Sequence, residues 1–253
     1  MRIAIVTGAS SGMGRDFVYA VKEEYNPECI WLIARREDRL KEIAEGIDCP
    51  CEILPLDLTL SESIMTIKEK LENEKPVVSV LVNASGFGKF GKFEAVNLET
   101  QMNMIDLNDK ALVAMTYITL PYMQRGSVIY QLCSLSSFQP VPYIGVYGAT
   151  KAFVLSFSRA VNRELKSAGI RSMAVSPGWV KTEFFDRAVN DDTITYYNKF
   201  YTSEEVVKRA VRDMKKGKDV SICGLQVRIQ VFFTKLLPHK LVMNIWCKQQ
   251  KKK

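Results

Sequence analysis

The chain has 253 residues, 47% of them hydrophobic and 25% charged, which is enough to bury one substantial core. Its formal net charge of +7 comes from the end of the chain, because residues 220–253 hold seven Lys and Arg side chains and no acid. This distribution argues against a nucleic-acid-binding surface across the body and leaves an interfacial role for the basic tail open.

The sequence contains no recognisable export signal, membrane-spanning segment or metal-binding motif. No cationic stretch followed by a long apolar run opens the chain, and 18 consecutive uncharged apolar residues occur nowhere. We therefore expect no export signal, no membrane span and a cytoplasmic location, with peripheral membrane contact through the tail left open. The six cysteines form no CxxC pair and the chain has one histidine, so we predict reduced thiols and no metal site.

Short apolar runs bounded by turn residues predict buried parallel strands. They lie at residues 3–6, 30–34, 51–54, 77–82, 127–132, 171–175 and, more weakly, 220–223. Segments of helical length lie between them, at 12–24, 38–45, 61–73, 99–123, 147–167 and 203–215, and we expect Asp38 and Ser61 to be N-caps. The alternation predicts an α/β fold: a single-domain, Rossmann-like, doubly wound parallel sheet flanked by helices.

Three glycines stand where the first predicted strand turns into a helix, at Gly8, Gly12 and Gly14. Glycine permits a tight turn and a close approach of backbone N–H groups to a pyrophosphate, whose charge the helix N-terminus favours. An ordinary glycine-rich turn is the alternative. The position of this turn at the first strand-to-helix junction favours dinucleotide binding.

The second predicted strand ends in Arg35 and Arg36, where an NAD-binding chain normally has a carboxylate. Two guanidinium groups suit a ribose 2′-phosphate, so we predict NADP(H) as the cofactor. A solvated arginine pair at a helix start is the alternative reading. Asp57 and Leu58, after the third strand, are expected to border the adenine pocket.

Tyr147 and Lys151 lie one helical turn apart, on the same face of a predicted helix. A nearby cation favours the ionised phenol, so we expect Lys151 to lower the pKa of Tyr147 toward a range useful for proton transfer. Ser134 ends the fifth strand thirteen residues earlier and is expected to polarise a substrate oxygen. Ser136 and Ser137 are alternatives for that role.

Over roughly residues 2–182 these motifs together resemble the short-chain dehydrogenase/reductase family. Residues 7–14 match its TGxxxGxG turn, 147–151 its YxxxK motif and 177–182 its PGxVxT segment. Residues 83–86 resemble its NNAG motif, from which Ser85 departs.

The resemblance implies NADP(H)-dependent oxidoreduction with Asn108, Ser134, Tyr147 and Lys151 as catalytic residues, Asn108 holding a water molecule behind the lysine. The cofactor-binding residues that the turn, the arginines and the resemblance imply are Gly8, Ser10, Ser11, Gly12, Met13, Gly14, Arg35, Arg36, Asp57, Leu58, Asn83, Ala84, Tyr147, Lys151, Pro177, Gly178, Val180 and Thr182.

Aromatic residues are frequent in the segment 183–202, and they favour an apolar substrate, hydroxysteroid-like, bile acid-like or 3-oxoacyl. Packing of these rings on the body is the alternative. We predict a catalytic domain over 1–224 and a basic amphipathic extension over 225–253. That extension suits a membrane surface, a covering helix or a subunit contact, and residues 225–231 alternate like a strand. We expect a homo-oligomer, and a non-catalytic NADP(H) sensor is the alternative function.

Overall fold

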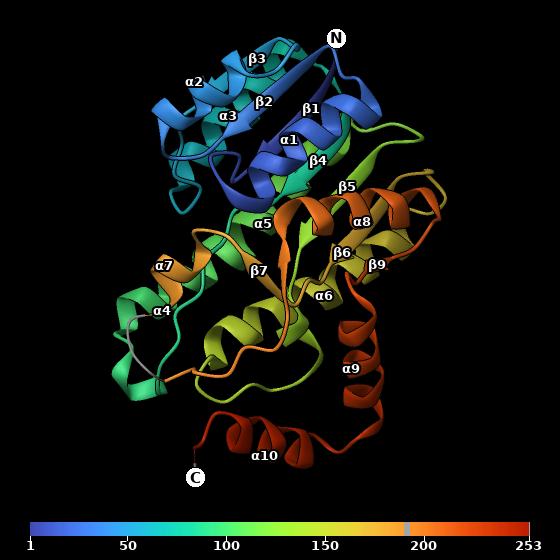
Figure 1. Cartoon of the computed structure of the whole chain (residues 1–253). Helices are drawn as coiled ribbons and strands as arrows, with labels where there is room; N and C mark the ends of the chain where they lie inside the picture. The colour runs from blue at the N-terminus through green and yellow to red at the C-terminus, as the bar shows by residue number, and fades with distance from the viewer. Residues whose placement is uncertain (190–192, 253) are drawn as a thin grey trace.

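The computed structural model describes residues 1–189 and 193–252. Seven parallel strands form the central sheet in the order β3-β2-β1-β4-β5-β6-β9 (Figure 1). They are β1 (Arg2–Thr7), β2 (Cys29–Ile33), β3 (Cys51–Leu54), β4 (Val77–Asn83), β5 (Val128–Leu132), β6 (Arg171–Val175) and β9 (Val220–Ser221). The strand order reverses between β1 and β4, which is where an open parallel sheet leaves a crevice at its carboxyl edge. The predicted doubly wound sheet is confirmed, and only the last strand is shorter than expected.

Helices cover both faces of this sheet because the strands alternate their apolar side chains. On one face Ala4 and Val6 of β1 share a core with α1 (Gly12–Tyr25), α2 (Glu37–Glu45) and α8 (Ser203–Lys215). On the other face Ile3 and Ile5 share a core with α3 (Ser61–Glu74) and α5 (Ala111–Thr119). The long helix α6 (Gly145–Glu164) packs beside α5 on that second face.

The two predicted N-caps are wrong, although α3 begins at Ser61 as predicted. Arg36 is the N-cap of α2 and Leu60 is the N-cap of α3, so Asp38 and Ser61 already lie inside their helices. In the first turn their side chains still suit the positive end of the helix dipole, which is why the residue types pointed to the right region but not to the exact boundary.

The helix predicted over 99–123 is broken. It consists of α4 (Leu98–Ile105), a π-helical turn η2 (Asp106–Lys110), α5 and a 3-10 turn η3 (Leu120–Tyr122). It begins at Leu98 because the Asn97 side chain accepts a hydrogen bond from the backbone N–H of Thr100 at 2.8 Å. The π-turn inserts an extra residue at Asn108, a distortion common at functional sites.

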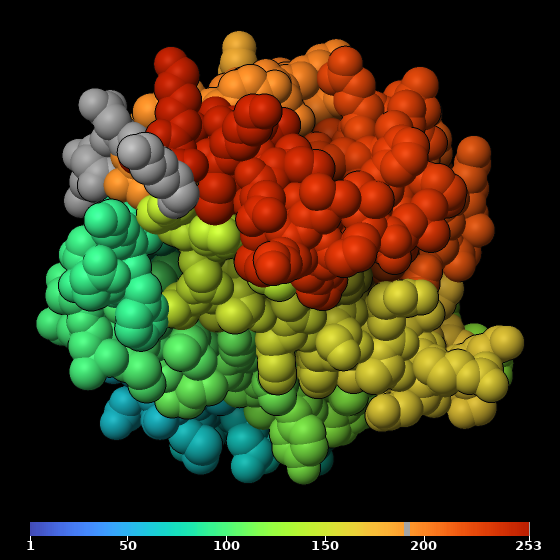
Figure 2. Space-filling model, turned by 90° about the horizontal axis from the view of Figure 1, so that it is seen from below, coloured from blue at the N-terminus to red at the C-terminus, as the bar shows by residue number. Residues whose placement is uncertain are grey.

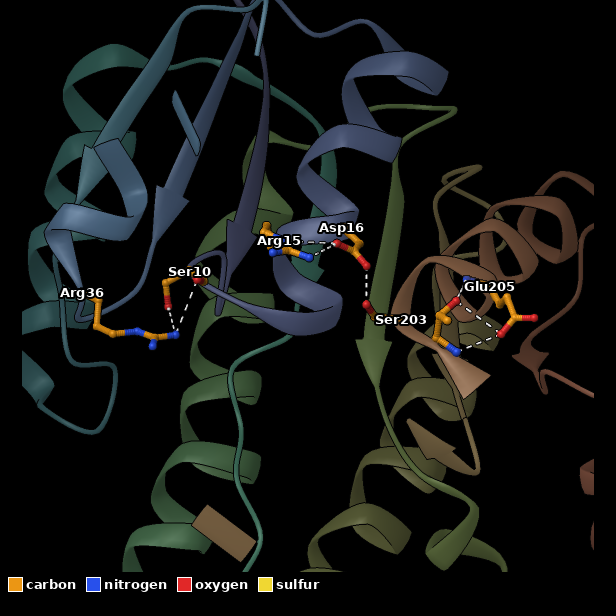
Figure 3. Close-up of polar contacts among 7 residues, drawn as sticks. Ser10, Arg15, Asp16, Arg36, Ser203 and Glu205 are labelled. Atoms are coloured by element: carbon orange, nitrogen blue, oxygen red, sulfur yellow. Dashed lines mark hydrogen bonds and ion pairs between the residues drawn. The ribbon is translucent and has the colours of Figure 1, made fainter. Parts of the chain in front are cut away.

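The segment after β6 forms β7 (Trp179–Lys181), α7 (Phe184–Ala188) and β8 (Phe200–Thr202), with β7 and β8 paired as a small parallel sheet. Thr202 and Glu205 form a capping box at the start of α8, and the Ser203 hydroxyl bonds Asp16 of α1 (Figure 3). The hydrogen bond between Ser203 and Asp16 thus joins the start of α8 to α1. Short 3-10 turns η1 (Phe93–Ala95) and η4 (Leu135–Phe138) complete the loops at the carboxyl edge.

The tail forms two helices, α9 (Leu225–Leu236) and α10 (His239–Gln249), below the carboxyl edge of the sheet (Figure 1). Residues 225–231 are therefore helical, so the strand reading is wrong, and Pro238 separates the two helices. None of the helices described here is long and apolar enough to cross a membrane.

Hydrogen bonds hold α10 against the body. The Trp246 indole donates to the Pro142 carbonyl at 3.0 Å. The buried Gln250 side chain accepts from the N–H groups of Thr195 and Tyr196, both at 2.9 Å, and donates to the Tyr196 carbonyl at 3.1 Å. One glutamine thus joins the end of the chain to the segment that precedes β8.

We expect Gln250→Ala to lower the melting temperature by roughly 3–8 °C, because two partly buried N–H groups lose their acceptor. Thermal unfolding followed by circular dichroism measures this. The matched control is Gln226→Ala on the exposed side of α9, which should change the melting temperature by about 1 °C or less. Equal effects of the two substitutions would contradict the anchoring role of Gln250.

Candidate active site

A cavity of about 570 Å³ lies at the strand-to-helix turn after β1, and we call it the glycine cavity. The backbone there is too close for side chains: a Cβ on Gly14 would lie 2.0 Å from the Gly8 carbonyl oxygen. Gly8 also has a φ of +65°, which L side chains rarely adopt. The turn leads into the N-terminus of α1, so its N–H groups are able to hold an anion such as a pyrophosphate.

Twelve of the predicted cofactor residues line this cavity. They are Gly8, Ser10, Ser11, Gly12, Met13, Gly14, Arg35, Arg36, Asp57, Leu58, Ala84 and Thr182. Asn83 does not, because its amide nitrogen is buried and donates to Gln131 at 2.9 Å and Thr116 at 3.1 Å. Its hydrogen bond with Gln131 joins β4 to β5.

The two predicted arginines lie at the edge of the glycine cavity and face carboxylates. Arg36 pairs with Glu183 at 2.9 Å and contacts the Ser10 hydroxyl at 3.3 Å (Figure 3). Arg35 lies 3.6 Å from Asp57. Burial raises the pKa of Asp57, but hydrogen bonds from Thr59 and the charge of Arg35 outweigh it, so the net shift is downward.

Arg187 is a third cation in this cavity, and sequence reasoning missed it. Its guanidinium lies 3.6 Å from the ring centroid of Phe87. Burial lowers its pKa, and the positive charge of Arg35 lowers it further, so the two arginines face a common space. No motif marks this position, since it falls in α7 beyond the PGxVxT segment.

Ser134, Tyr147 and Lys151 come together where β5 meets α6. The Ser134 hydroxyl lies near enough to the Tyr147 phenol to lower its pKa. The Lys151 ammonium is buried, donates to the Leu132 carbonyl at 2.8 Å and lies 5.8 Å from the Tyr147 ring centroid. The sequence spacing therefore brings three of the four predicted catalytic residues into one cluster.

Asn108, the fourth, lies next to this cluster. Its side-chain oxygen accepts from the Phe87 N–H at 3.0 Å, and its nitrogen donates to the Phe87 carbonyl and to Thr150, both at 3.0 Å. A Cβ on Gly86 would lie 2.9 Å from the Asn108 oxygen and 3.4 Å from the Lys151 nitrogen. The two side chains thus meet at a glycine that leaves them room.

The two alternative serines are placed differently from Ser134. The Ser137 hydroxyl donates to the Ser134 carbonyl at 2.6 Å, and the Ser136 backbone N–H donates to the Ser134 hydroxyl at 3.2 Å. Both residues are buried and steady the Ser134 loop. Of the three serines, Ser134 is the one whose hydroxyl lowers the pKa of Tyr147.

The pKa of Tyr147 departs from the expected direction. Burial raises it above its ordinary value of 10.0, and the Ser134 hydroxyl only partly opposes the rise. The phenol ring packs against the rings of Phe90 and Phe184, whose centroids are 6.4 and 5.5 Å away. These rings come from other segments and contribute to the burial, so the phenol holds its proton at neutral pH.

A second cavity, of about 390 Å³, opens beside Ser134 and Tyr147, and we call it the aromatic pocket. Pro177, Gly178 and Val180, which the resemblance implied to be cofactor-binding residues, line this pocket and not the glycine cavity. Its remaining wall is mostly apolar and comes from separate segments: Phe90, Val141, Ile144, Trp179, Phe184, Phe185 and Tyr196. Polar side chains are few, and those of Asn198 and Gln230 lie in the wall formed by the later segments.

The tail forms one wall of this pocket. Phe233, Thr234 and Leu237 come from α9 and its end, and Ile245 and Trp246 come from α10. The Trp246 ring stacks on Trp179 with centroids 6.5 Å apart. The sequence pattern did not place these residues at the site, because their own segment carries no motif.

Comparison with known proteins agrees with this geometry. The model of the short chain dehydrogenase family matches residues 2–193. The chain belongs to the short-chain dehydrogenase family. It is therefore an oxidoreductase of the short-chain type, and the predicted resemblance is confirmed.

Individual relatives of this short-chain dehydrogenase cover most of its length. The NADP-dependent 3-hydroxy acid dehydrogenase of Schizosaccharomyces pombe is 30% identical over 219 residues, 83% of each chain. Sulfoacetaldehyde reductase 2 of Chromohalobacter salexigens is 33% identical over 191 residues, 72% of this chain and 74% of that one. A short-chain dehydrogenase from Sphingobium yanoikuyae, solved in complex with NADPH, superposes with a TM-score of 0.76 at 28% identity, covering 88% and 87% of the two chains.

Asp109 is a half-buried carboxylate of this dehydrogenase that no motif pointed to. It follows Asn108 on the π-turn, and within residues 1–189 and 193–252 its Oδ1 atom has no hydrogen-bond partner. Burial raises its pKa from 3.8 to about 7, and the positive charge of Lys151 opposes the rise. The carboxylate therefore lies within electrostatic reach of the catalytic cluster.

We expect Asp109→Asn to stabilise the protein more at about pH 8 than at about pH 5. When folding raises the pKa of an acid, the free energy of unfolding falls as the pH increases from the pKa of the unfolded state to that of the folded state. Asparagine does not titrate, so the variant does not lose this stability. The gain should be about 1 kcal/mol near pH 8, or roughly 2–4 °C in melting temperature.

Melting curves at the two pH values test this, with Asp106→Asn as the control. Asp106 is on the same π-turn, but its carboxylate pairs with Lys110 at 2.7 Å, so its loss should not stabilise the protein. A gain from Asp109→Asn that is the same at both pH values would contradict the titration argument.

Proposed function

We propose that this short-chain dehydrogenase uses NADP(H) to interconvert a carbonyl group and a secondary alcohol on a lipophilic substrate. The observation that carries the proposal is the cluster of Ser134, Tyr147 and Lys151 at the point where the glycine cavity meets the aromatic pocket. The names of the relatives, among them an NADP-dependent 3-hydroxy acid dehydrogenase and a sulfoacetaldehyde reductase, support this reaction class.

The glycine cavity fits a dinucleotide phosphate. Backbone atoms of Gly8 and Gly14 approach each other too closely for side chains, which leaves N–H groups open to a pyrophosphate. Arg35 and Arg36 would hold a 2′-phosphate in exchange for their present contacts with carboxylates, and Arg187 adds a third positive charge to the same cavity. When bound, NADP(H) supplies or accepts the hydride.

Tyr147 serves as the proton donor in the direction of carbonyl reduction. Its raised pKa keeps the phenol protonated at neutral pH, so the proton is available to the oxygen that gains charge. The Ser134 hydroxyl, beside the phenol, donates a second hydrogen bond to that oxygen and orients it. Lys151 fixes α6 on β5 and supplies positive charge under the phenol, and Asn108 holds the Phe87 backbone next to it.

The shape and chemistry of the aromatic pocket support the proposed substrate class. A volume of about 390 Å³ with a wall of aromatic and aliphatic side chains suits a hydroxysteroid-like, bile acid-like or 3-oxoacyl compound. Asn198 and Gln230 offer hydrogen bonds to a polar group remote from the carbonyl. We assign the catalytic core to residues 1–224 and the wall formed by α9 and α10 to the extension 225–253. The homo-oligomer and the cytoplasmic location stay predictions.

We expect Tyr147→Phe to lower turnover by about a hundred- to ten-thousand-fold while leaving NADPH binding intact, because only the transferable proton is lost. NADPH absorbance against ketosteroids, oxo bile acids, 3-oxoacyl thioesters and aromatic ketones measures turnover, and fluorescence titration measures binding. Turnover that survives the substitution would refute the role of Tyr147. Tight NADPH binding by the native enzyme without turnover of any compound would favour the non-catalytic sensor.

We expect Arg35→Ala with Arg36→Ala to raise the KM for NADPH by about 10- to 100-fold and to change the KM for NADH little, because the lost charge-assisted hydrogen bonds serve the 2′-phosphate. Steady-state kinetics with each cofactor measure both values. The control is Arg39→Ala in α2, whose guanidinium pairs with Glu42 at 3.2 Å and does not line the glycine cavity. A parallel rise for both cofactors would argue against 2′-phosphate recognition.

A further inference from the structure

The outer side of α9 carries an apolar stripe. Its members are Leu225, Ile229, Phe232, Phe233 and Leu236, exposed by 64%, 48%, 60%, 51% and 65%. Their spacing of four, seven, eight and eleven residues from the first places them on one face of the helix. Leu241 and Ile245 of α10 are exposed by 45% and 44% and extend the apolar surface to the second helix. These seven apolar side chains are therefore all exposed to water by 44% or more.

The fold fixes the stripe on the outside. The opposite side of α9 is buried through Val227, Val231 and Thr234, which already pack on the body. The second helix is held by the hydrogen bonds of Trp246 and Gln250. Neither helix is able to turn its exposed apolar side chains inward without giving up these contacts. In the space-filling view of Figure 2 the two helices lie over one face of the molecule.

The charge around the stripe has one sign. Arg228, Lys235, Lys240 and Lys248 are exposed on the same two helices, and the sequence from 220 to its end has no acid. The loops beside them, residues 135–144 and 193–201, add Lys199 and no carboxylate. An apolar stripe bordered by bases is complementary to a surface that is apolar inside and negatively charged at its boundary.

A second copy of the chain fits this surface poorly. An isologous contact would place the stripe against the same stripe of the other copy, and the bases around it would face one another. Within residues 135–144, 193–201 and 225–252, no carboxylate is present to compensate this repulsion. An anionic lipid surface meets both requirements, because it takes up the apolar side chains and pairs with the bases.

We propose that α9 and α10 bind the surface of an anionic lipid bilayer, with the aromatic pocket opening toward it. Phe233 and Ile245 belong both to the exposed apolar surface and to the pocket wall, so the rim of the pocket lies at the proposed contact. A lipophilic substrate then enters from the bilayer without crossing water. The bilayer contact stands on the surface alone, while the route of the substrate rests on the proposed function.

Sedimentation with vesicles tests the contact on the full-length protein. We expect the protein to sediment with vesicles of phosphatidylcholine and phosphatidylglycerol, and to stay in the supernatant with phosphatidylcholine alone. Binding should weaken as salt is added, because exposed charges are screened. The variant Tyr147→Phe should bind the vesicles like the native protein, so an inactive enzyme and a failed contact are told apart.

Two sets of substitutions assign the contact to the stripe and to the bases. Ile229→Ser with Phe232→Ser and Leu236→Ser should weaken vesicle binding about tenfold or more, since these side chains point outward and do not line the pocket. Lys235→Gln with Lys240→Gln and Lys248→Gln should weaken it by about a hundredfold. The matched control is Leu60→Ser with Met65→Ser near the start of α3, where the exposures are 54% and 48%, and it should bind as before.

Two results would overturn the proposal. One is a native protein that stays in the supernatant with the anionic vesicles. The other is a dimer, seen by light scattering, that the stripe substitutions convert to monomer in the absence of any vesicle binding. The second result would assign the apolar stripe to self-association instead. Circular dichroism of each variant verifies that the fold is intact before binding is compared.

Discussion

The buried ammonium group of Lys151 is the constraint around which the active site is arranged. A charge removed from water needs a compensating partner, and here the Leu132 carbonyl at the end of β5 accepts its hydrogen bond at 2.8 Å. Burial lowers the pKa of Lys151, and the negative charge of Asp109 raises it. Because this bond fixes α6 against β5, it also fixes Tyr147, one turn earlier on the helix, and Ser134, two residues beyond the carbonyl. The catalytic geometry is thus a consequence of how one lysine is solvated by the protein.

The two cavities are joined through a shared wall. Three residues line both of them: Met13 from the glycine turn, Thr182 from the link between β7 and α7, and Phe184 from the start of α7. The glycine turn follows β1, next to the point where the strand order reverses and the carboxyl ends of the strands diverge. Phe184 also packs on Tyr147 with ring centroids 5.5 Å apart. A substitution of Phe184 would therefore alter the cofactor site, the substrate site and the pKa of the phenol.

Sequence reasoning succeeded where a local pattern fixes the structure. The seven strands could be predicted because parallel strands buried on both faces read as continuous apolar runs, and the glycine turn because its glycines adjoin a strand and a helix. The π-turn at Asn108 could not, since the apolar periodicity continues across it. The raised pKa of Tyr147 was missed for a different reason: the spacing to Lys151 is local, whereas Phe90 and Phe184 reach the phenol from distant segments. Arg187 and Trp246 were likewise placed only by the fold.

The tail illustrates the same limit most clearly, because its sequence suited a strand, a covering helix and an interfacial helix equally well. Both sides of α9 are apolar, so hydrophobic periodicity alone does not say which side the body buries. The structure divides the two sides: Val227 and Val231 pack inward, and Ile229 and Phe232 remain in water. One apolar side of the helix packs on the body and the other is left outside, and Phe233 of that outer side also lines the aromatic pocket. The helix therefore links the substrate site to whatever covers its outer side. The basic residues around it, with no acid among them, then decide which kind of surface that is.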